Sequence, residues 1–195
     1  MTKTITRQDI VSLHTYSQGR EEYLPKMIAY KKNRRIQLAE NISVLFENRN
    51  TVLFQIQELL HSEDLADPGE IDEYIEIYSG MLPLEDELSA TLFIELDNQA
   101  KLTELLKELK GIEHHLSLVI GGETVQAVFE EVHDDREFTT SVHYLKFPLS
   151  QAAKNLLLNE SADTLDVTLQ LNHPSLTAQV SLSPNSIKSL QKDLT

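Results

Sequence analysis

The sequence predicts an α+β protein, with N-terminal helices followed by an antiparallel-rich sheet that has helices interspersed between its strands. Three observations predict this class. Helix signals dominate residues 7–33. The pair Gly121-Gly122 joins two apolar strand patterns, as a tight hairpin turn requires. A second hairpin pattern surrounds residues 172–175 near the end of the chain.

Capping signals and apolar periodicity locate the helices. Thr6 and Asp9 resemble a capping box, which predicts a short helix over 7–15. A second helix is predicted over 20–33, with Pro25 in its first turns, where the missing N–H is tolerated. Its stripe consists of Leu24, Met27, Ile28 and Lys31. Further helices are expected over 50–61, 70–78, 101–109, 151–158 and from Pro184 onward. In the first of these, Val52, Ile56, Leu59 and Leu60 are expected to face the core, and Gln57, Glu58 and His61 to face solvent.

Alternation and turn residues locate the strands. A hairpin is predicted from 36–38 and 42–46, with Ala39-Glu40-Asn41 between its strands. The other strands are expected over 88–96, 115–120, 124–129, 139–147, 165–171 and 177–182. The polar stretch 130–138 is expected to be an exposed loop.

The composition is that of a single globular domain over residues 1–195, with 41% hydrophobic and 25% charged residues. The lack of cysteine excludes thiol nucleophiles, disulfides and iron–sulfur clusters held by this chain. The N-terminus lacks the apolar region of a signal peptide, and no apolar run approaches the ~18 residues of a membrane span. We therefore expect a cytoplasmic protein without membrane association.

Basic and acidic residues are segregated along the chain. Residues 1–49 carry nine basic and five acidic side chains, whereas residues 50–100 carry 13 acidic side chains and no Lys or Arg. The net charge of −14 argues against nucleic-acid binding, which requires cations against phosphate. The segregation leaves two alternatives open: a charged site, or charged faces that dock on each other or on a partner.

Catalytic sequence motifs are missing. No phosphate-binding loop, dinucleotide fingerprint, nucleophile elbow or H-E-x-x-H motif occurs. Glu58 and His61 have the Glu-x-x-His spacing of di-iron ligands, as do Glu130 and His133. Because the second pair falls in an expected loop, we predict no metal and no cofactor, and His61 and His133 are the candidate ligands if a metal is present.

The basic cluster 31–35 lies close to Arg49 at a predicted strand-to-helix junction. Arginine recognises carboxylate and phosphate with two parallel hydrogen bonds, so these cations could hold a small anion or pair with the acidic segment 63–87. His143 on an apolar strand face and His173 in a turn suit structural hydrogen bonding or proton transfer. The candidate ligand-binding residues are Lys31, Arg35, Glu47, Arg49, Gln55, Glu58, His143 and His173.

Five segments in order resemble the bacterial DUF3501 family: 30–60, 90–95, 110–113, 141–147 and 172–174. The resemblance covers nearly the whole chain, and the chain departs from the family pattern with His61 in place of Arg. The family has no established activity. The resemblance implies an association with rubrerythrin-like proteins and iron–sulfur oxidoreductases, and hence an accessory role in a redox or oxidative-stress system.

We therefore expect a non-catalytic accessory or binding protein that docks a protein partner or copies of itself. The alternative is an enzyme or ligand-binding domain in which Arg, Gln, Glu and His side chains surround a small anionic ligand. The two differ in whether the candidate residues converge on one concave surface.

Overall fold

The structure is a computed structural model that describes residues 4–129 and 137–195. The chain divides into two compact units, each formed from two stretches of sequence. The helical unit comprises Met1–Lys32 and Glu47–Leu84, and the sheet unit comprises Asn33–Phe46 and Glu85–Thr195. The predicted α+β class is confirmed, and the single domain expected over residues 1–195 stays a prediction. Within the described ranges, no helix combines the length and hydropathy needed to cross a bilayer.

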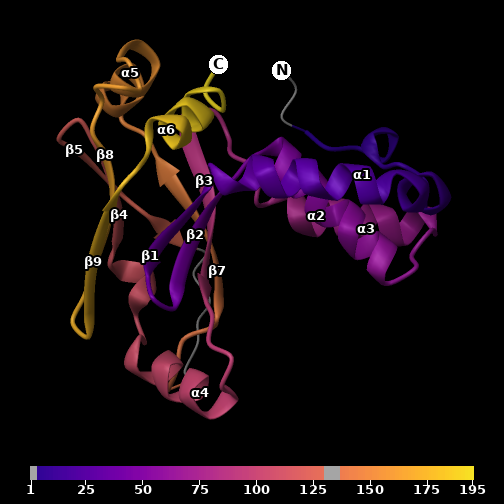
Figure 1. Ribbon diagram of the computed structural model, residues 1–195, viewed down its shortest axis with the longest axis horizontal. Coiled ribbons are helices and arrows are strands. Elements are labelled where there is room, and N and C mark those ends of the chain that lie inside the picture. The colour runs from indigo at the N-terminus through magenta and orange to yellow at the C-terminus, as the bar shows by residue number, and fades with distance from the viewer. Residues whose placement is uncertain (1–3, 130–136) are drawn as a thin grey trace. The chain divides into compact units, whose positions relative to one another are not determined.

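Helices α1 (Leu13–Lys32), α2 (Arg49–Ser62) and α3 (Pro68–Ser79) make up the helical unit, preceded by the single turn η1 (Arg7–Asp9). In Figure 1, α1 and α2 run side by side and α3 packs along α2. Asn48 starts α2 by accepting hydrogen bonds from the backbone N–H groups of Asn50 and Thr51. The buried residues that join these elements are Ile5, Val52, Ile56, Leu60, Met81 and Leu82.

The first helix differs from its prediction. The capping box at Thr6 is present, but it starts only the turn η1, and α1 is continuous from Leu13 to Lys32. The predicted bounds 7–15 and 20–33 are therefore wrong. Pro25 lies in the helix interior, where it removes one backbone hydrogen bond. Ile28, which was placed on one stripe with Met27, is 62% exposed, whereas Met27 is buried.

Helix α2 confirms the expected core positions Val52, Ile56 and Leu60. Gln57 was expected to face solvent, and this is wrong, because its side chain is 4% exposed. Its amide nitrogen donates to the Val11 carbonyl and its amide oxygen accepts from the Val11 N–H, both at 2.9 Å. A buried amide is tolerated here because both of its polar atoms are bonded.

Two antiparallel sheets form the sheet unit (Figure 1). One has the strand order β1-β2-β3-β7-β6 and the other β5-β4-β8-β9. The strands are β1 (Arg35–Ala39), β2 (Ile42–Glu47), β3 (Glu87–Ile94), β4 (Leu116–Ile120), β5 (Glu123–Gln126), β6 (Val128–Phe129), β7 (Val142–Pro148), β8 (Val167–His173) and β9 (Leu176–Ser181). Residue Glu47, the last of β2, is counted with the helical unit. One continuous apolar core includes residues of both sheets, for example Phe46, Leu92, Phe147, Leu118 and Leu169.

The glycine hairpin is confirmed. Gly121 and Gly122 have φ of 54° and 92°, which a side chain would disfavour, and they join β4 to β5. The strand expected over 124–129 is divided, because the chain leaves one sheet after Gln126 and joins the other as β6. The Ala127 N–H donates to the Leu116 carbonyl at this change of sheet.

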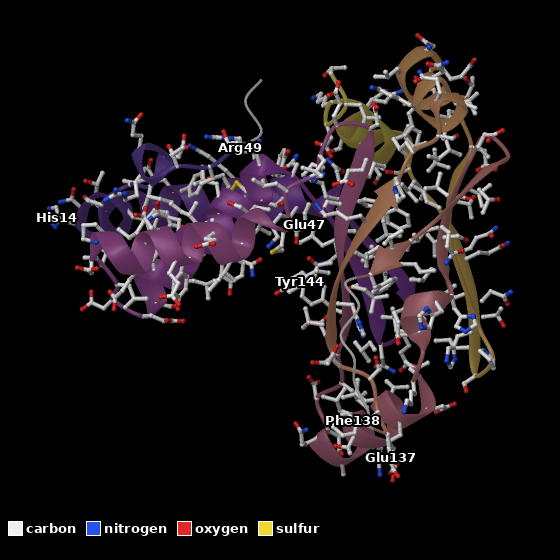
Figure 2. The ribbon with its side chains drawn as sticks, turned by 180° about the vertical axis from the view of Figure 1, so that it is seen from behind. His14, Glu47, Arg49, Glu137, Phe138 and Tyr144 are labelled. Carbon is white, nitrogen blue, oxygen red and sulfur yellow. The ribbon has the colours of Figure 1, made fainter. Side chains whose placement is uncertain are left out.

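Helices close the ends of the sheet unit. In Figure 1, α4 (Gln99–Glu108) lies at one end of the sheets, and α5 (Gln151–Asn159) and α6 (Pro184–Gln191) lie at the other. The turn η2 (Ile112–His114) links α4 to β4. Glu137 and Phe138 lie beside α4 (Figure 2), where the Thr139 N–H donates to the Leu106 carbonyl.

Arg34 connects the start of β1 to the C-terminal segment. Its side chain is fully buried. Nη2 lies 2.6 Å from Asp193 Oδ2, Nη1 donates to Ser189 Oγ at 2.8 Å, and Nε donates to the Phe46 carbonyl at 2.8 Å. A buried guanidinium is stable only with such a set of partners, so Arg34 of the basic cluster serves the fold.

Candidate functional site

A groove of about 340 Å³ lies in the helical unit between α1 and α2. It is lined by Asp9, Val11, Thr15, Tyr16, Gly19, Tyr23, Leu53, Phe54 and Gln57. The residues that α1 contributes follow helical spacing, so they form one face of that helix. A Cβ added at Gly19 would meet no atom within 4 Å, which shows that the groove is open at this point.

Three aromatic rings form the apolar wall of the groove. Tyr16 and Tyr23 meet edge to face with centroids 6.2 Å apart, and Tyr23 meets Phe54 in the same manner at 5.9 Å. The Lys31 Nζ lies 5.3 Å from the centre of the Phe54 ring. Tyr23 remains 37% exposed. The rings therefore hold one another in place and leave part of their surface to solvent.

Glu58 fixes Tyr16 behind this wall. The Tyr16 hydroxyl donates to Oε1 at 2.6 Å, and Arg20 donates to both carboxylate oxygens, from Nε at 2.8 Å and from Nη2 at 2.7 Å. The Arg20 hydrogen bonds lower the pKa of Glu58 against the opposing effect of burial. Burial and the hydrogen bond to Glu58 raise the pKa of Tyr16. At neutral pH the cluster therefore holds a carboxylate, a guanidinium and a neutral phenol.

Asp9 and Arg49 stand at the other end of the groove. Arg49, the first residue of α2 (Figure 2), donates from Nη2 to Asp9 Oδ1 at 2.5 Å and from Nε to the Thr4 carbonyl at 3.1 Å. The Thr6 backbone N–H donates to Asp9 Oδ2 at 2.8 Å. This N–H, followed by Arg49, lowers the pKa of Asp9. The predicted residues Arg49 and Glu58 thus each hold a groove residue rather than lining the groove.

Three other predicted residues lie elsewhere in the helical unit. Glu47, labelled in Figure 2, is buried, and its carboxylate accepts a hydrogen bond from the Thr51 hydroxyl. Lys31 lies over Phe54. Gln55 is half-buried on α2 and does not line the groove. Glu47 therefore supports the start of α2, and Lys31 flanks the aromatic wall.

Arg35 belongs to the sheet unit. Its guanidinium stacks on Phe93 at 4.8 Å, donates to Ser43 Oγ at 3.0 Å and lies 3.6 Å from the Glu95 carboxylate. The sequence left open a pairing of the cations with residues 63–87. Arg35 instead pairs with Glu95 and Arg49 with Asp9, whereas Arg7 pairs with Asp72 at 2.9 Å.

His143 occupies the opposite face of the same sheet. It pairs in register with buried Leu92, whereas Val142 pairs with Phe93, on which Arg35 stacks. Adjacent strand residues point to opposite faces. The Thr139 hydroxyl lies 2.9 Å from His143 Nε2. Burial lowers the pKa of His143, and the charge of Glu113 opposes this shift.

His173 ends β8 in the other sheet and has a structural environment. Nε2 lies 2.9 Å from the Lys110 carbonyl, and Nδ1 accepts from the Ser175 N–H at 3.2 Å. This pattern requires a neutral ring whose Nε2–H donates. His115 packs edge-on against it at 5.1 Å. His173 therefore closes the turn between β8 and β9.

The metal candidates do not assemble among the described residues. His61 lies near Glu58, but its Nδ1 is 3.3 Å from the Ser17 hydroxyl and its ring packs edge-on against Tyr16. His133 lies outside the described residues. Across 4–129 and 137–195, no group of three or more His, Asp or Glu side chains is arranged to hold a metal ion.

The structure thus divides the predicted site residues between the units. Arg35, His143 and His173 lie in the sheet unit and the other five in the helical unit; their role as ligand-binding residues stays a prediction. The groove residues Tyr16 and Tyr23 were missed, as was Arg20. All three follow the spacing i, i+4, i+7 on α1, a signal that the sequence contained, but the wrong start of that helix concealed it.

Comparisons with known proteins agree with this fold. The DUF3501 model, described as a protein of unknown function, matches residues 4–194. The chain is similar to a crystal structure of a protein of unknown function from Burkholderia pseudomallei, with 31% identity and a TM-score of 0.90 over 98% of this chain and 100% of that chain. A comparison with curated proteins gives no match. Because the family model spans almost the whole sequence, the chain belongs to the DUF3501 family.

Proposed function

We propose that this protein is a non-catalytic accessory protein whose helical unit docks a basic surface of a protein partner. The observation that carries the proposal is a row of exposed acidic residues on α3. Glu70, Glu73 and Glu76 are exposed there at helical spacing, and no Lys or Arg occurs between Arg49 and Lys101.

The contacts of the neighbouring acids sharpen this argument. Asp67 caps α3, Glu63 accepts from the Tyr74 hydroxyl at 2.5 Å, and Asp72 pairs with Arg7. Glu70, Glu73 and Glu76 have no such cationic or hydroxyl partner in the part of the chain that the structure describes. Their charge is therefore available to attract and orient a basic partner.

The family resemblance supplies the partner classes to test first, rubrerythrin-like proteins and iron–sulfur oxidoreductases. A role beside such a redox system requires no catalytic group of this chain's own. A second copy of this chain is a further candidate partner, since the sequence also carries an N-terminal stretch of net +4 charge over residues 1–49.

The alternative, a pocket for a small anion, has weaker support. An anion needs available cations, yet Arg20, Arg35 and Arg49 each already bond a carboxylate. An incoming anion would have to displace that carboxylate, at the cost of an existing charge-assisted hydrogen bond.

The test is complex formation between purified proteins, followed by sedimentation velocity. The variant E70Q/E73Q/E76Q removes three charges from α3. The matched control E104Q/E108Q/E123Q removes three exposed charges from the sheet unit. We expect the α3 variant alone to weaken the complex, at least about tenfold at about 0.05 M salt, with the difference fading towards about 0.5 M. Equal loss in both variants, or no complex with either partner class or with itself, would contradict the proposal.

A further inference from the structure

The groove between α1 and α2 offers hydrogen-bond acceptors. The Tyr16 hydroxyl hydrogen is donated to Glu58, so its oxygen can face the groove only as an acceptor. Asp9 contributes a carboxylate. The Gln57 amide is already bonded through both polar atoms to the Val11 backbone. A ligand that brings donors therefore has the Asp9 carboxylate and the Tyr16 oxygen as acceptors.

The aromatic wall favours a cation. The faces of Tyr and Phe rings carry negative potential and attract ammonium and guanidinium groups within about 6 Å. The molecule contains an example at this wall, since Lys31 Nζ lies 5.3 Å from the centre of the Phe54 ring. The exposed part of Tyr23 extends the same surface.

The charges at the two ends of the groove agree with this preference. Arg20 is held by Glu58, and Arg49 is held by Asp9. The Thr6 N–H and Arg49 lower the pKa of Asp9, so it is charged at neutral pH. An anion entering the groove meets the Asp9 carboxylate. A cation can donate to that carboxylate while Arg49 stays bonded to it, because a carboxylate has about four acceptor positions.

We infer that this groove receives the cationic side chain, Lys or Arg, of a basic segment of the protein partner. The methylene stem packs on Leu53 and the rings, and the charged end lies near Asp9 and the Tyr16 oxygen. Long cationic side chains bind in this divided manner because the stem is apolar and the head is not. The inference rests on the proposed function, which supplies a basic partner, and adds the position where one of its residues is anchored.

The experiment uses the full chain and three synthetic nine-residue peptides labelled with fluorescein. The first contains Lys, Arg, Ser and Gly; the second has norleucine for each cation; the third has Glu for each cation. Fluorescence polarisation gives affinity, and NMR follows the ring protons of Tyr16, Tyr23 and Phe54. Gly19→Leu fills the groove, where a Cβ meets nothing within 4 Å. Gln18→Leu places the same side chain at the adjacent exposed position outside the groove lining.

We expect the basic peptide to bind wild type and Q18L equally and to shift the ring protons. G19L should weaken binding at least about tenfold, the loss expected when an anchor side chain is excluded. Circular dichroism verifies that both variants are folded. Tight binding of the norleucine or Glu peptide, or unchanged binding of the basic peptide to G19L, overturns the inference.

The α3 variant separates this inference from the proposed function. If the basic peptide still binds G19L but binds E70Q/E73Q/E76Q more weakly, the acidic face of α3 is the docking surface and the groove is ruled out as the binding site. If the basic peptide binds G19L more weakly but binds E70Q/E73Q/E76Q as well as wild type, the groove is the binding site and α3 is ruled out as the docking surface. Failure of the basic peptide to bind wild type overturns the groove inference, and the complex-formation experiment then decides the proposed function.

Discussion

The buried ion pair of the sheet unit differs from the ion pairs at the groove of the helical unit. In the sheet unit, Arg34 and Asp193 form an ion pair whose side chains are 0% and 5% exposed. In the helical unit, Arg20 with Glu58 and Arg49 with Asp9 form pairs that are a quarter to a third exposed. Removing one partner of a buried pair strongly destabilises the fold, because the other charge is left buried. An exposed pair contributes little stability and remains accessible to a partner.

The basic cluster 31–35 shows the same difference between buried and exposed charge. The basic cluster 31–35 lies at the point where the chain passes from the helical unit to the sheet unit. Arg34 is buried and structural, whereas the adjacent Arg35 stacks on Phe93 at the surface. A cluster that is uniform in sequence therefore contains residues with different roles.

The largest expected effect comes from breaking the buried pair. Arg34→Ala leaves the Asp193 carboxylate buried without its cation, so it should lower the free energy of unfolding by about 3–5 kcal/mol. Arg35→Ala is the control and should cost less than ~1 kcal/mol, because Arg35 and Glu95 are exposed. Urea unfolding followed by circular dichroism gives both values. Similar costs for the two variants would contradict the contrast between buried and exposed charge.

The next largest change in stability is expected from substituting one glycine in each unit. Gly111 in the sheet unit has φ of 86°, so Gly111→Ala should destabilise the protein by about 1–2 kcal/mol. Thermal unfolding of the variant measures this cost. An unchanged melting temperature would show that the left-handed conformation at this turn is not required.

Substituting Gly19 in the helical unit should change the stability in the opposite direction. It lies inside α1, and an added Cβ meets no atom. Gly19→Ala should therefore stabilise the protein by about 0.5–1 kcal/mol, because alanine loses less backbone entropy in a helix. The same thermal scans measure it, and a decrease in melting temperature would argue against the open groove at this position.

The sequence predicted correctly those parts of the fold that are encoded by residues close to one another in the chain. Apolar periodicity and hairpin turns are encoded by nearby residues, so α2 and the Gly121-Gly122 turn were located correctly. The start of α1 was missed because Ser12, whose hydroxyl accepts from the Thr15 N–H, initiates it without a capping box. The change of sheet after Gln126 depends on distant strands and has no local signal.

The candidate site was harder to predict because its chemistry is tertiary. Glu58 was identified from its polarity, but its bonding to Tyr16 and Arg20 spans 42 and 38 residues of sequence. Arg35 and His143 shared no sequence feature that would place them on opposite faces of one sheet. Residue type alone therefore indicated which side chains could act, and not which of them meet.

As the pH is lowered from neutral, the stability contribution of His143 in the sheet unit should be the first to decrease. Burial lowers its pKa below the ordinary 6.5, so the unfolded state binds a proton more readily than the folded state. Its stabilising contribution is complete above pH 6.5 and falls as the pH decreases through the range between the two pKa values. The stability difference between wild type and His143→Gln should shrink over this range. A pH-independent difference would contradict a buried neutral imidazole.

Glu58 should give the smallest effect, at lower pH. Its folded pKa lies below the ordinary 4.5, so the contribution of the Arg20 pair is complete above pH 4.5 and is lost as the pH falls through the lowered pKa. The difference between wild type and Glu58→Gln should be constant from neutral pH to about pH 5 and should vanish below that range. A stability difference that begins to shrink at higher pH for Glu58→Gln than for His143→Gln would contradict this order.

The central claim is that the helical unit, and not the sheet unit, recognises a basic partner. An amide chemical-shift map of the full chain, recorded while the basic nine-residue peptide is added, tests it most directly. We expect shifts concentrated on α1, α2 and α3, with the signals of the β-strands unchanged. Shifts concentrated on the strands, with α1 and α3 unaffected, would contradict it.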